Sequence, residues 1–277
     1  MYKIVAIQTL APQTKLIIVH APEVAEKAQA GQFVILRVDE RGERIPLTLV
    51  DWKPKNGTIV LIFQEVGVST KKLGSLNVNE ELFDVVGPLG NPSDIKYYGT
   101  AVVIGGGVGI APCLPIATAL QKVGNEVISI LGARNEKLLI LEEEMKRVST
   151  KVHISTDDGS KGHKGFVSDI LKSLIEKGNS IDVVYAIGPS VMMRAVAEVT
   201  RSHKIKTIVS LNPIMVDGMG MCGACRVSVG GKVKFACVDG PEFDAHQVDF
   251  DQLIKRQQAF IAEENLALEH IEKHGGN

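Results

Sequence analysis

Short alternations of apolar and polar residues dominate the first third of the chain. Segments such as KLIIVHAP, GQFVILRV, IPLTLVDW and GTIVLIFQEV are separated by Gly, Pro and Asn at short intervals. Alternation with closely spaced turn residues is typical of half-buried antiparallel strands. Residues 1–97 are therefore predicted to form a small antiparallel β-barrel, with partly helical character only over 22–30 and 71–76.

The pattern changes near residues 97–100. From there, apolar runs such as AVVI, EVISILGA and IDVVYAI alternate with longer helical segments such as APCLPIATALQKVG and VMMRAVAEVTRSHK. Strands that alternate with helices predict a parallel sheet with helices on both faces. The expected fold class is α/β plus all-β. The expected domains are a barrel (1–97), an α/β nucleotide-binding domain (98–211), a small cysteine-containing element (212–249), and a charged helix and tail (250–277).

Composition excludes several classes of protein. The formal net charge is −1 over 277 residues, and no basic stripe appears, which argues against nucleic acid as the main ligand. No apolar run reaches the length of a membrane span. The first residues alternate like a strand and lack a signal-peptide pattern, so we expect a cytoplasmic protein.

Three of the four cysteines lie in one short segment, VDGMGMCGACRVSVGGKVKFAC. Asp217, Cys222, Cys225 and Cys237 read D-x4-C-x2-C-x11-C. This spacing is that of the plant-type [2Fe-2S] ferredoxins with aspartate at the first position. The pattern predicts a [2Fe-2S] cluster held by three thiolates and the Asp217 carboxylate.

Two alternatives remain open for the cysteine segment. It could be a small zinc ribbon, or a hairpin that simply buries its cysteines. If the cluster is present, hydroxide, water or a partner residue could take the fourth position instead of Asp217.

A glycine-rich turn follows the run AVVI and precedes a helix, which is where a nucleotide diphosphate meets free backbone N–H groups. The strict G-x-G-x-x-G order is absent, because Pro112 occupies the place of the third glycine counted from Gly107. The candidate nucleotide-binding residues of this turn are Gly105, Gly106, Gly107, Gly109, Ile110, Ala111 and Pro112.

Two further segments follow predicted parallel strands, at the edge where open α/β sheets bind ligands. They contribute Asp157 and Asp158 after KVHIS, and Gly188, Pro189 and Met192 after IDVVYAI. Arg134 follows EVISILGA and could meet a 2′-phosphate or pair with a carboxylate, so NAD(H) and NADP(H) both remain open.

Two barrel segments carry a candidate flavin site. In RIPLT, an arginine can hold a diphosphate by paired hydrogen bonds, and a threonine can donate to the flavin ring. The second segment, FQEVGVST, places a glycine and hydroxyls before a helical turn. The candidates are Arg44, Pro46, Leu47, Thr48, Phe63, Gln64, Gly67, Ser69 and Thr70.

Taken together, RIPLT, GVST, GPLGNP, GGGVGIAP, TDDGSKG and GPSVMM occur in the order seen in the ferredoxin–NADP+ reductase superfamily, which the chain resembles over residues 1 to about 250. With the cysteine segment it is similar to the electron-transfer subunits of class-B dihydroorotate dehydrogenase. It is more similar to the small subunit of NADH-dependent reduced ferredoxin:NADP+ oxidoreductase, because Asp217 departs from the four-cysteine pattern.

The resemblance implies FAD in the barrel, a nicotinamide nucleotide in the α/β domain and a cluster facing a larger catalytic subunit. The expected activity is hydride exchange between NAD(P)H and FAD, followed by single-electron exchange with that subunit, through which ferredoxin could be reached. The expected flavin could also bifurcate electrons. The alternatives are the electron-transfer subunit of a dihydroorotate dehydrogenase and a stand-alone NAD(P)H:flavin reductase with a structural metal.

Cys113 and the C-terminal helix each allow two interpretations. Cys113 follows the glycine turn directly and is a weak catalytic candidate, because a packed core thiol is the simpler interpretation. The charged helix expected over residues 250–274 carries an irregular stripe of Leu253, Phe260, Leu268 and Ile271. That helix could pack on its own domain or on the larger subunit.

Overall fold

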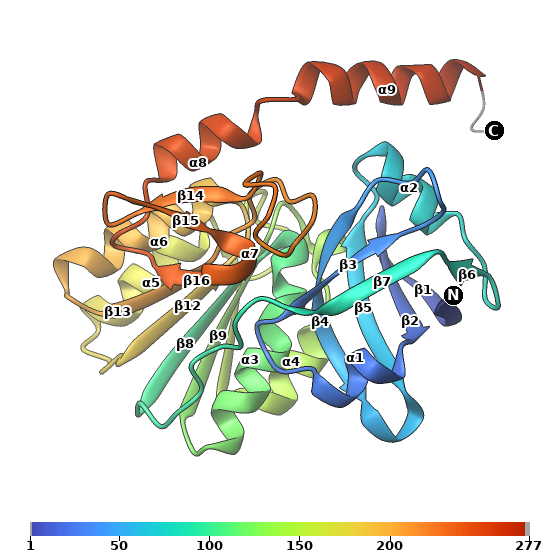
Figure 1. Ribbon diagram of the computed structural model, residues 1–277. Helices are drawn as coiled ribbons and strands as arrows, with labels where there is room; N and C mark the ends of the chain where they lie inside the picture. Colours follow the sequence, from blue (N-terminus) through green and yellow to red (C-terminus); the bar gives the residue numbers. More distant parts are fainter. Residues whose placement is uncertain (1, 275–277) are drawn as a thin grey trace.

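The computed structural model describes residues 2–274, apart from the side chains of 271, 272 and 274. Two seven-stranded sheets form the body, and the N-terminal one is antiparallel throughout, with strand order β6-β1-β2-β5-β4-β3-β7 (Figure 1). Its elements are β1 (Tyr2–Ala11), β2 (Thr14–His20), α1 (Pro22–Lys27), β3 (Phe33–Arg37), β4 (Ile45–Lys53), η1 (Pro54–Asn56), β5 (Thr58–Gln64), α2 (Val68–Gly74), β6 (Glu81–Leu82) and β7 (Asp84–Leu89). The predicted antiparallel barrel is confirmed.

The second sheet has the order β11-β10-β9-β8-β12-β13-β16, and all its pairs are parallel except β13–β16. Its strands are β8 (Thr100–Gly106), β9 (Glu126–Ala133), β10 (Lys151–Thr156), β11 (His163–Lys164), β12 (Val183–Ile187), β13 (Lys206–Ser210) and β16 (Glu242–Asp244). Between them run η2 (Gly107–Gly109), α3 (Ile110–Lys122), η3 (Glu136–Leu138), α4 (Glu142–Val148), α5 (Val167–Glu176) and α6 (Ser190–Ser202). The predicted α/β domain is therefore confirmed.

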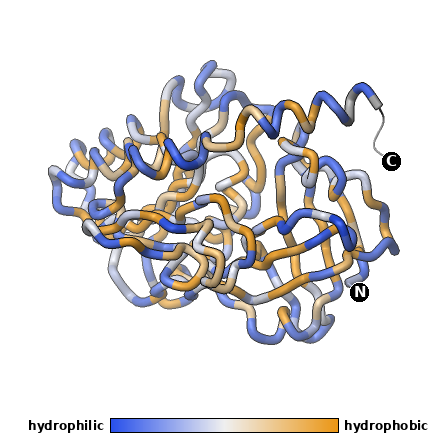
Figure 2. Tube along the Cα trace, turned by 45° about the horizontal axis from the view of Figure 1, so that its top comes forward, coloured by the Kyte–Doolittle hydropathy of each residue, from blue (hydrophilic) through white to orange (hydrophobic). Residues whose placement is uncertain are grey.

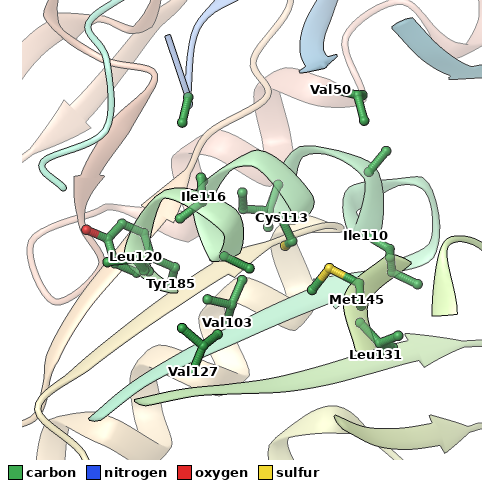
Figure 3. Packing of buried hydrophobic residues seen from close by; sticks show 14 of the residues in the cluster. Val50, Val103, Ile110, Cys113, Ile116, Leu120, Val127, Leu131, Met145 and Tyr185 are labelled. Atoms are coloured by element: carbon green, nitrogen blue, oxygen red, sulfur yellow. The ribbon is translucent and has the colours of Figure 1, made fainter. Parts of the chain in front are cut away.

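Apolar residues concentrate along the strands, and hydrophilic residues occupy outer loops and helix faces (Figure 2). One face of the parallel sheet packs against α5, α6 and the C-terminal helix α8 (Phe250–Gln257). Helices α3 and α4 cover the other face. The α3 core also includes Val50 and Ile62 of the barrel, so α3 joins the two domains (Figure 3). The relative position of the barrel and the α/β domain is thus fixed by shared buried surface.

The cysteine segment forms a hairpin of β14 (Arg226–Val229) and β15 (Lys232–Phe235), followed by α7 (Ala236–Asp239) and β16. Because β16 pairs with β13, this segment is built into the edge of the nucleotide-domain sheet. Its other side packs against barrel strand β3, where Phe33 and Ile35 meet Met215, Cys225 and Cys237. The cysteines therefore lie between the two large domains.

The C-terminal segment is two helices, α8 (Phe250–Gln257) and α9 (Ile261–His274), where the sequence pattern predicted one. Leu253 is on the buried face of α8, whereas Phe260 is half-exposed in the connection between the helices. Leu268 is half-buried on α9, which reaches α2 of the barrel, and the side chain of Ile271 lies outside the described residues. The connection between α8 and α9 contains neither Pro nor Gly. The last turn of α8 is held by side-chain hydrogen bonds, which are described below.

Candidate functional site

The nucleotide-binding candidates lie where the strand order of the parallel sheet reverses. Strand β9 follows β8 on one side of the sheet, and β12 returns to the other side of β8. In open α/β sheets, ligands bind at the carboxyl ends of the strands at such a switch point. The turns after β8 and β12 meet here.

Close backbone approach explains the glycines in these turns. A Cβ atom at Gly106 would lie 2.4 Å from Met192 Sδ, and one at Gly109 would lie 2.4 Å from the Ile187 carbonyl oxygen. Gly107 differs, because it has φ +57° and a Cβ there would meet nothing within 4 Å. Gly106 and Gly109 thus allow the two turns to pack closely. Gly107 faces the open space that a diphosphate requires.

The helices that follow these turns begin in the same place. A Cβ at Gly105 would lie 2.6 Å from the Ile110 Cα at the start of α3. The side chains of Ile110 and Ala111 are fully buried and that of Pro112 is half-buried, so a nucleotide would meet mainly their backbone. Pro189 caps α6, and its carbonyl oxygen accepts from the N–H groups of the next helical turn.

The loop after β10 approaches the loop after β9. The Asp157 N–H donates to the Ala133 carbonyl at 3.1 Å, and the Asp158 N–H donates to the Arg134 carbonyl at 3.3 Å. The Asp158 carboxylate accepts from the Ser160 hydroxyl at 2.7 Å and N–H at 2.9 Å, and these bonds lower its pKa. Arg134 and Asp157 are both exposed, so this edge can meet a ribose or its phosphate.

The Cys113 thiol is buried and contacts backbone carbonyl groups of β8 and of the nucleotide turn. Its side chain is fully buried among α3 core residues, and the Sγ atom lies 3.2 Å from the Gly109 carbonyl oxygen and 3.4 Å from that of Ile104 (Figure 3). Burial raises the pKa of this thiol well above its ordinary value. The geometry is that of a packed core residue, which is the simpler of the two interpretations of Cys113.

The two flavin segments predicted in the barrel meet in the structure. The Ser69 hydroxyl, in the first turn of α2, donates to the carboxylate of Glu43, the residue before Arg44. Arg44 is half-buried, and its guanidinium has no hydrogen bond or ion pair among residues 2–274. A Cβ at Gly67, the cap of α2, would meet nothing within 4 Å. An unpaired arginine beside an open helix start fits a diphosphate.

The Thr70 hydroxyl is already engaged within its own turn. It accepts from the N–H groups of Gly67 at 3.0 Å and Val66 at 3.1 Å, and it lies 3.1 Å from the Gly67 carbonyl. Thr70 therefore shapes the start of α2 and leaves the backbone N–H groups of the first turn to a ligand. Phe63 is a barrel core residue, and Gln64 ends β5 opposite Thr14.

The face of β4 that carries Pro46 and Thr48 is continuous with the face that packs against the cysteine segment. Pro46 pairs with Ile35 and Thr48 pairs with Phe33 across β3 and β4, so each pair shares a face of the sheet. Phe33 and Ile35 pack against Cys225 and Cys237. Leu47 points to the opposite, inner side of the barrel. A ring on Pro46 and Thr48 would therefore lie next to the cysteines.

The sequence did not single out Phe33 and Ile35 for this role. A signal was present, because FVIL in β3 is an uninterrupted apolar run, and all four of these residues are buried. Such a run indicates a strand buried on both faces.

The cysteine loop brings two of its thiols together. The Sγ atoms of Cys225 and Cys237 lie 3.2 Å apart, and both residues are 2% exposed. Burial, together with the neighbouring Cys225 thiol, raises the pKa of Cys237 to about 12. A pair of buried thiols at this separation fits two ligands of one iron, which would displace their protons.

Asp217 and Cys222 form a second pair in the same loop. The Asp217 carboxylate accepts from the N–H groups of Met219 at 2.9 Å, Met221 at 3.0 Å and Cys222 at 2.7 Å, and these bonds lower its pKa. Among the described residues, no three His, Cys, Asp or Glu side chains converge as around a single metal ion. Two separate pairs fit a two-iron cluster better than a zinc ribbon, which needs four converging ligands.

A largely buried carboxyl group lies at the junction of the domains. Glu242, in β16, accepts from the Ser93 hydroxyl at 2.6 Å, and Ser93 belongs to the connection between barrel and α/β domain. Burial raises the pKa of Glu242 to about 7, although the Ser93 hydrogen bond opposes the shift. Glu242 therefore titrates near neutral pH.

Comparison with known proteins agrees with this arrangement. The model of the iron-sulfur cluster binding domain of dihydroorotate dehydrogenase B matches residues 212–249, and the oxidoreductase NAD-binding domain model matches residues 103–198. A solved phthalate dioxygenase reductase shares the fold at 17% identity, with a TM-score of 0.61 over 82% of this chain and 85% of the other. No helix within residues 2–274 is long and apolar enough to cross a membrane.

Two relatives match nearly the whole chain. A chain of the NADH-dependent reduced ferredoxin-NADP oxidoreductase structure, described for flavin-based electron bifurcation, is 43% identical, with a TM-score of 0.93 over 98% of both chains. The dihydroorotate dehydrogenase B (NAD(+)), electron transfer subunit homolog of Thermotoga maritima is 46% identical over 93% of this chain and 91% of its own. The chain therefore belongs to the family of dihydroorotate dehydrogenase B electron-transfer subunits and their homologues.

Proposed function

We propose that this chain is the FAD-, NAD(H)- and [2Fe-2S]-binding electron-transfer subunit of an NADH-dependent ferredoxin:NADP+ oxidoreductase. It would act with a larger catalytic subunit. The observation that carries the proposal is the match to the solved oxidoreductase over 98% of both chains, which includes the C-terminal helices. Asp217 at the first cysteine position supports the same branch of the family.

In this proposal the barrel holds FAD. Arg44 and the backbone N–H groups at the start of α2 bind its diphosphate, because both are available to an anion. Pro46 and Thr48 orient the ring on the barrel face that continues to the cysteine segment. When bound, the flavin supplies the conversion between a two-electron hydride and single electrons.

The α/β domain holds the nicotinamide nucleotide at the switch point. The turns at 105–109 and 188–189 present backbone to its diphosphate, and the edge around Arg134 and Asp157 receives the adenosine ribose. The protein needs no acid–base group for hydride exchange, so its contribution is orientation and exclusion of water. The burial of the Cys113 thiol agrees with this assignment.

Asp217, Cys222, Cys225 and Cys237 hold the cluster as two pairs. Cys225 and Cys237 are buried against the barrel, while Cys222 is exposed. The exposed corner is where the larger subunit would exchange single electrons. Asp217 carries the same charge as a thiolate, but it is a harder donor, so it would alter the reduction potential of the cluster.

A second function is supported by the family itself. The Thermotoga maritima relative and several others carry the name of the dihydroorotate dehydrogenase B electron-transfer subunit, for example that of Bacillus caldolyticus at 36% identity over 81% of this chain. In that case the larger subunit would supply electrons from dihydroorotate. A stand-alone flavin reductase would need neither subunit nor cluster.

The experiment is an assay of the chain co-purified anaerobically with its larger subunit. NADP+ reduction that requires both NADH and reduced ferredoxin supports the proposal. NAD+ reduction by dihydroorotate, without a ferredoxin requirement, would assign the second function. A protein that contains flavin but no iron, and that reduces free flavin alone, would overturn both.

A further inference from the structure

The last turn of α8 lies against the start of α6, which follows the nucleotide turn. The Ser190 hydroxyl, 5% exposed and first in α6, donates to Gln257 Oε1 at 2.8 Å. Gln257 Nε2 donates to Asn212 at two atoms, the carbonyl oxygen at 3.0 Å and Oδ1 at 2.9 Å. One glutamine amide thus connects the turn at 188–190 with the first residue of the cysteine element.

The neighbouring residue on α8 reaches the cysteine loop itself. Arg256 Nη2 donates to the Ala224 carbonyl oxygen at 3.1 Å, and Ala224 lies between Cys222 and Cys225. The Ala224 N–H in turn points to the Cys222 sulfur at 3.5 Å. A displacement of α8 would therefore move a backbone segment that hydrogen-bonds to a cluster sulfur.

The body of α8 packs into the core of the α/β domain. Phe250 and Leu253 are buried in the α/β core, and Arg194 of α6 pairs with Asp251 of α8 at 2.9 Å. The helix ends at Gln257, where these hydrogen bonds hold its last turn, and α9 continues separately toward α2 (Figure 1). A tightly packed interior transmits strain between sites.

We propose that Gln257 and Arg256 are positioning residues that couple occupancy of the nucleotide turn to the environment of the iron–sulfur cluster. This inference rests on the proposed function, because it takes the 188–190 turn as nucleotide-binding and the cysteine loop as cluster-binding. Hydrogen bonds to cluster sulfurs and to the backbone around them tune the reduction potential of such clusters. A nucleotide that shifts Ser190 would reach the cluster through Gln257, α8 and Arg256.

The test compares the EPR spectrum of the dithionite-reduced protein with and without NADH. The fully reduced protein is chosen because NADH then binds without transferring hydride. In the wild type, NADH is expected to shift the g-values of the cluster signal. Gln257→Ala and Arg256→Ala should each abolish this shift while iron and FAD contents stay at wild-type levels.

The matched controls are Lys255→Ala, on the same helix, and Gln258→Ala, at the residue that caps its end, because both side chains are exposed. These variants should keep the wild-type shift. Arg256→Lys keeps a donor and should restore part of the response. Gln257→Ala should also weaken NADH binding about two- to tenfold, because the net free energy of one hydrogen bond is about 0.5–1.5 kcal/mol.

The outcomes separate the coupling from the proposed function. If the wild type binds NADH and contains the cluster but shows no shift, the coupling is wrong and the function stands. A wild-type shift that persists in both alanine variants also overturns the coupling. Absence of NADH binding or of a cluster signal in the wild type would instead refute the proposed function.

Discussion

Gly218 offers a direct test of how closely the cysteine loop packs on the barrel. Its φ is +74°, which costs an alanine about 1–2 kcal/mol. A Cβ there would also lie 2.7 Å from Ile35 Cγ1 and 2.9 Å from Leu89 Cδ1, and overpacking of this kind costs a further ~1–3 kcal/mol. Gly218→Ala is therefore expected to cost about 2–5 kcal/mol of folding free energy.

Gly231 provides the matched control. It has φ +72° in the β14–β15 turn, and a Cβ there would meet nothing within 4 Å. Gly231→Ala should lose only the backbone contribution of about 1–2 kcal/mol. The difference between the two variants therefore measures the contact of the cysteine loop with β3 and β7.

Two measurements check this prediction. Urea unfolding followed by circular dichroism gives the stability difference, and iron per chain after anaerobic purification reports the cluster. Gly218→Ala should unfold at lower urea and retain less iron than Gly231→Ala. Equal midpoints and equal iron contents would refute the argument that the loop is pressed against the barrel.

Four further predictions concern single groups. Cys113→Ser should leave flavin reduction by NADH within twofold of wild type in stopped-flow traces, and a large loss would restore a catalytic role for the thiol. Gly109→Ala should weaken NADH binding at least tenfold by calorimetry, about 1.4 kcal/mol, because a Cβ there would collide with the Ile187 carbonyl oxygen. Asp217→Ala should lower iron content and alter the reduced-state EPR signal, and an unchanged signal would exclude Asp217 as a ligand. The Glu242 carboxyl has a folded-state pKa raised to about 7, so its contribution to stability is complete below its unfolded pKa near 4.5 and is lost as pH rises through 7. Glu242→Gln should thus stabilise the protein by at most about 3 kcal/mol at pH 8 and little at pH 4.5, and equal melting shifts at both pH values would contradict this sign.

Most of the fold could be predicted from the pattern of apolar and polar residues. Parts of β2 and β5 alternate, because Ile17 and Val19 are buried in β2 and Ile59 and Leu61 are buried in β5. Such period-two alternation identifies the barrel, and the longer helical segments identify the α/β sheet. The C-terminal helix was wrongly predicted to be continuous, because no Pro or Gly marks the break. The break follows hydrogen bonds of Arg256 and Gln257 to segments distant in sequence, which no local pattern encodes.

The candidate site was predicted in its segments but not in its contacts. Spacing identified the cysteine loop and the glycine turns, because their chemistry depends on residues close in sequence. The hydroxyl of Thr70 was expected to face a phosphate, yet it caps its own turn. β4 lies next to the cysteine loop because β4 pairs with β3, and β3 packs against the cysteines. The sequence pattern of one strand does not specify its pairing partner.

The pairing of β16 with β13 has a consequence for the evolution of this architecture. A fragment ending at residue 211 would leave β13 as a bare edge strand and remove Ala245, Phe250 and Leu253 from the core. Exposed edges invite pairing with other chains. We expect an ancestor that gained or lost the cysteine module to have needed another cover for β13 and for this part of the core. The cysteine module therefore completes the sheet of the α/β domain as well as carrying the cysteines.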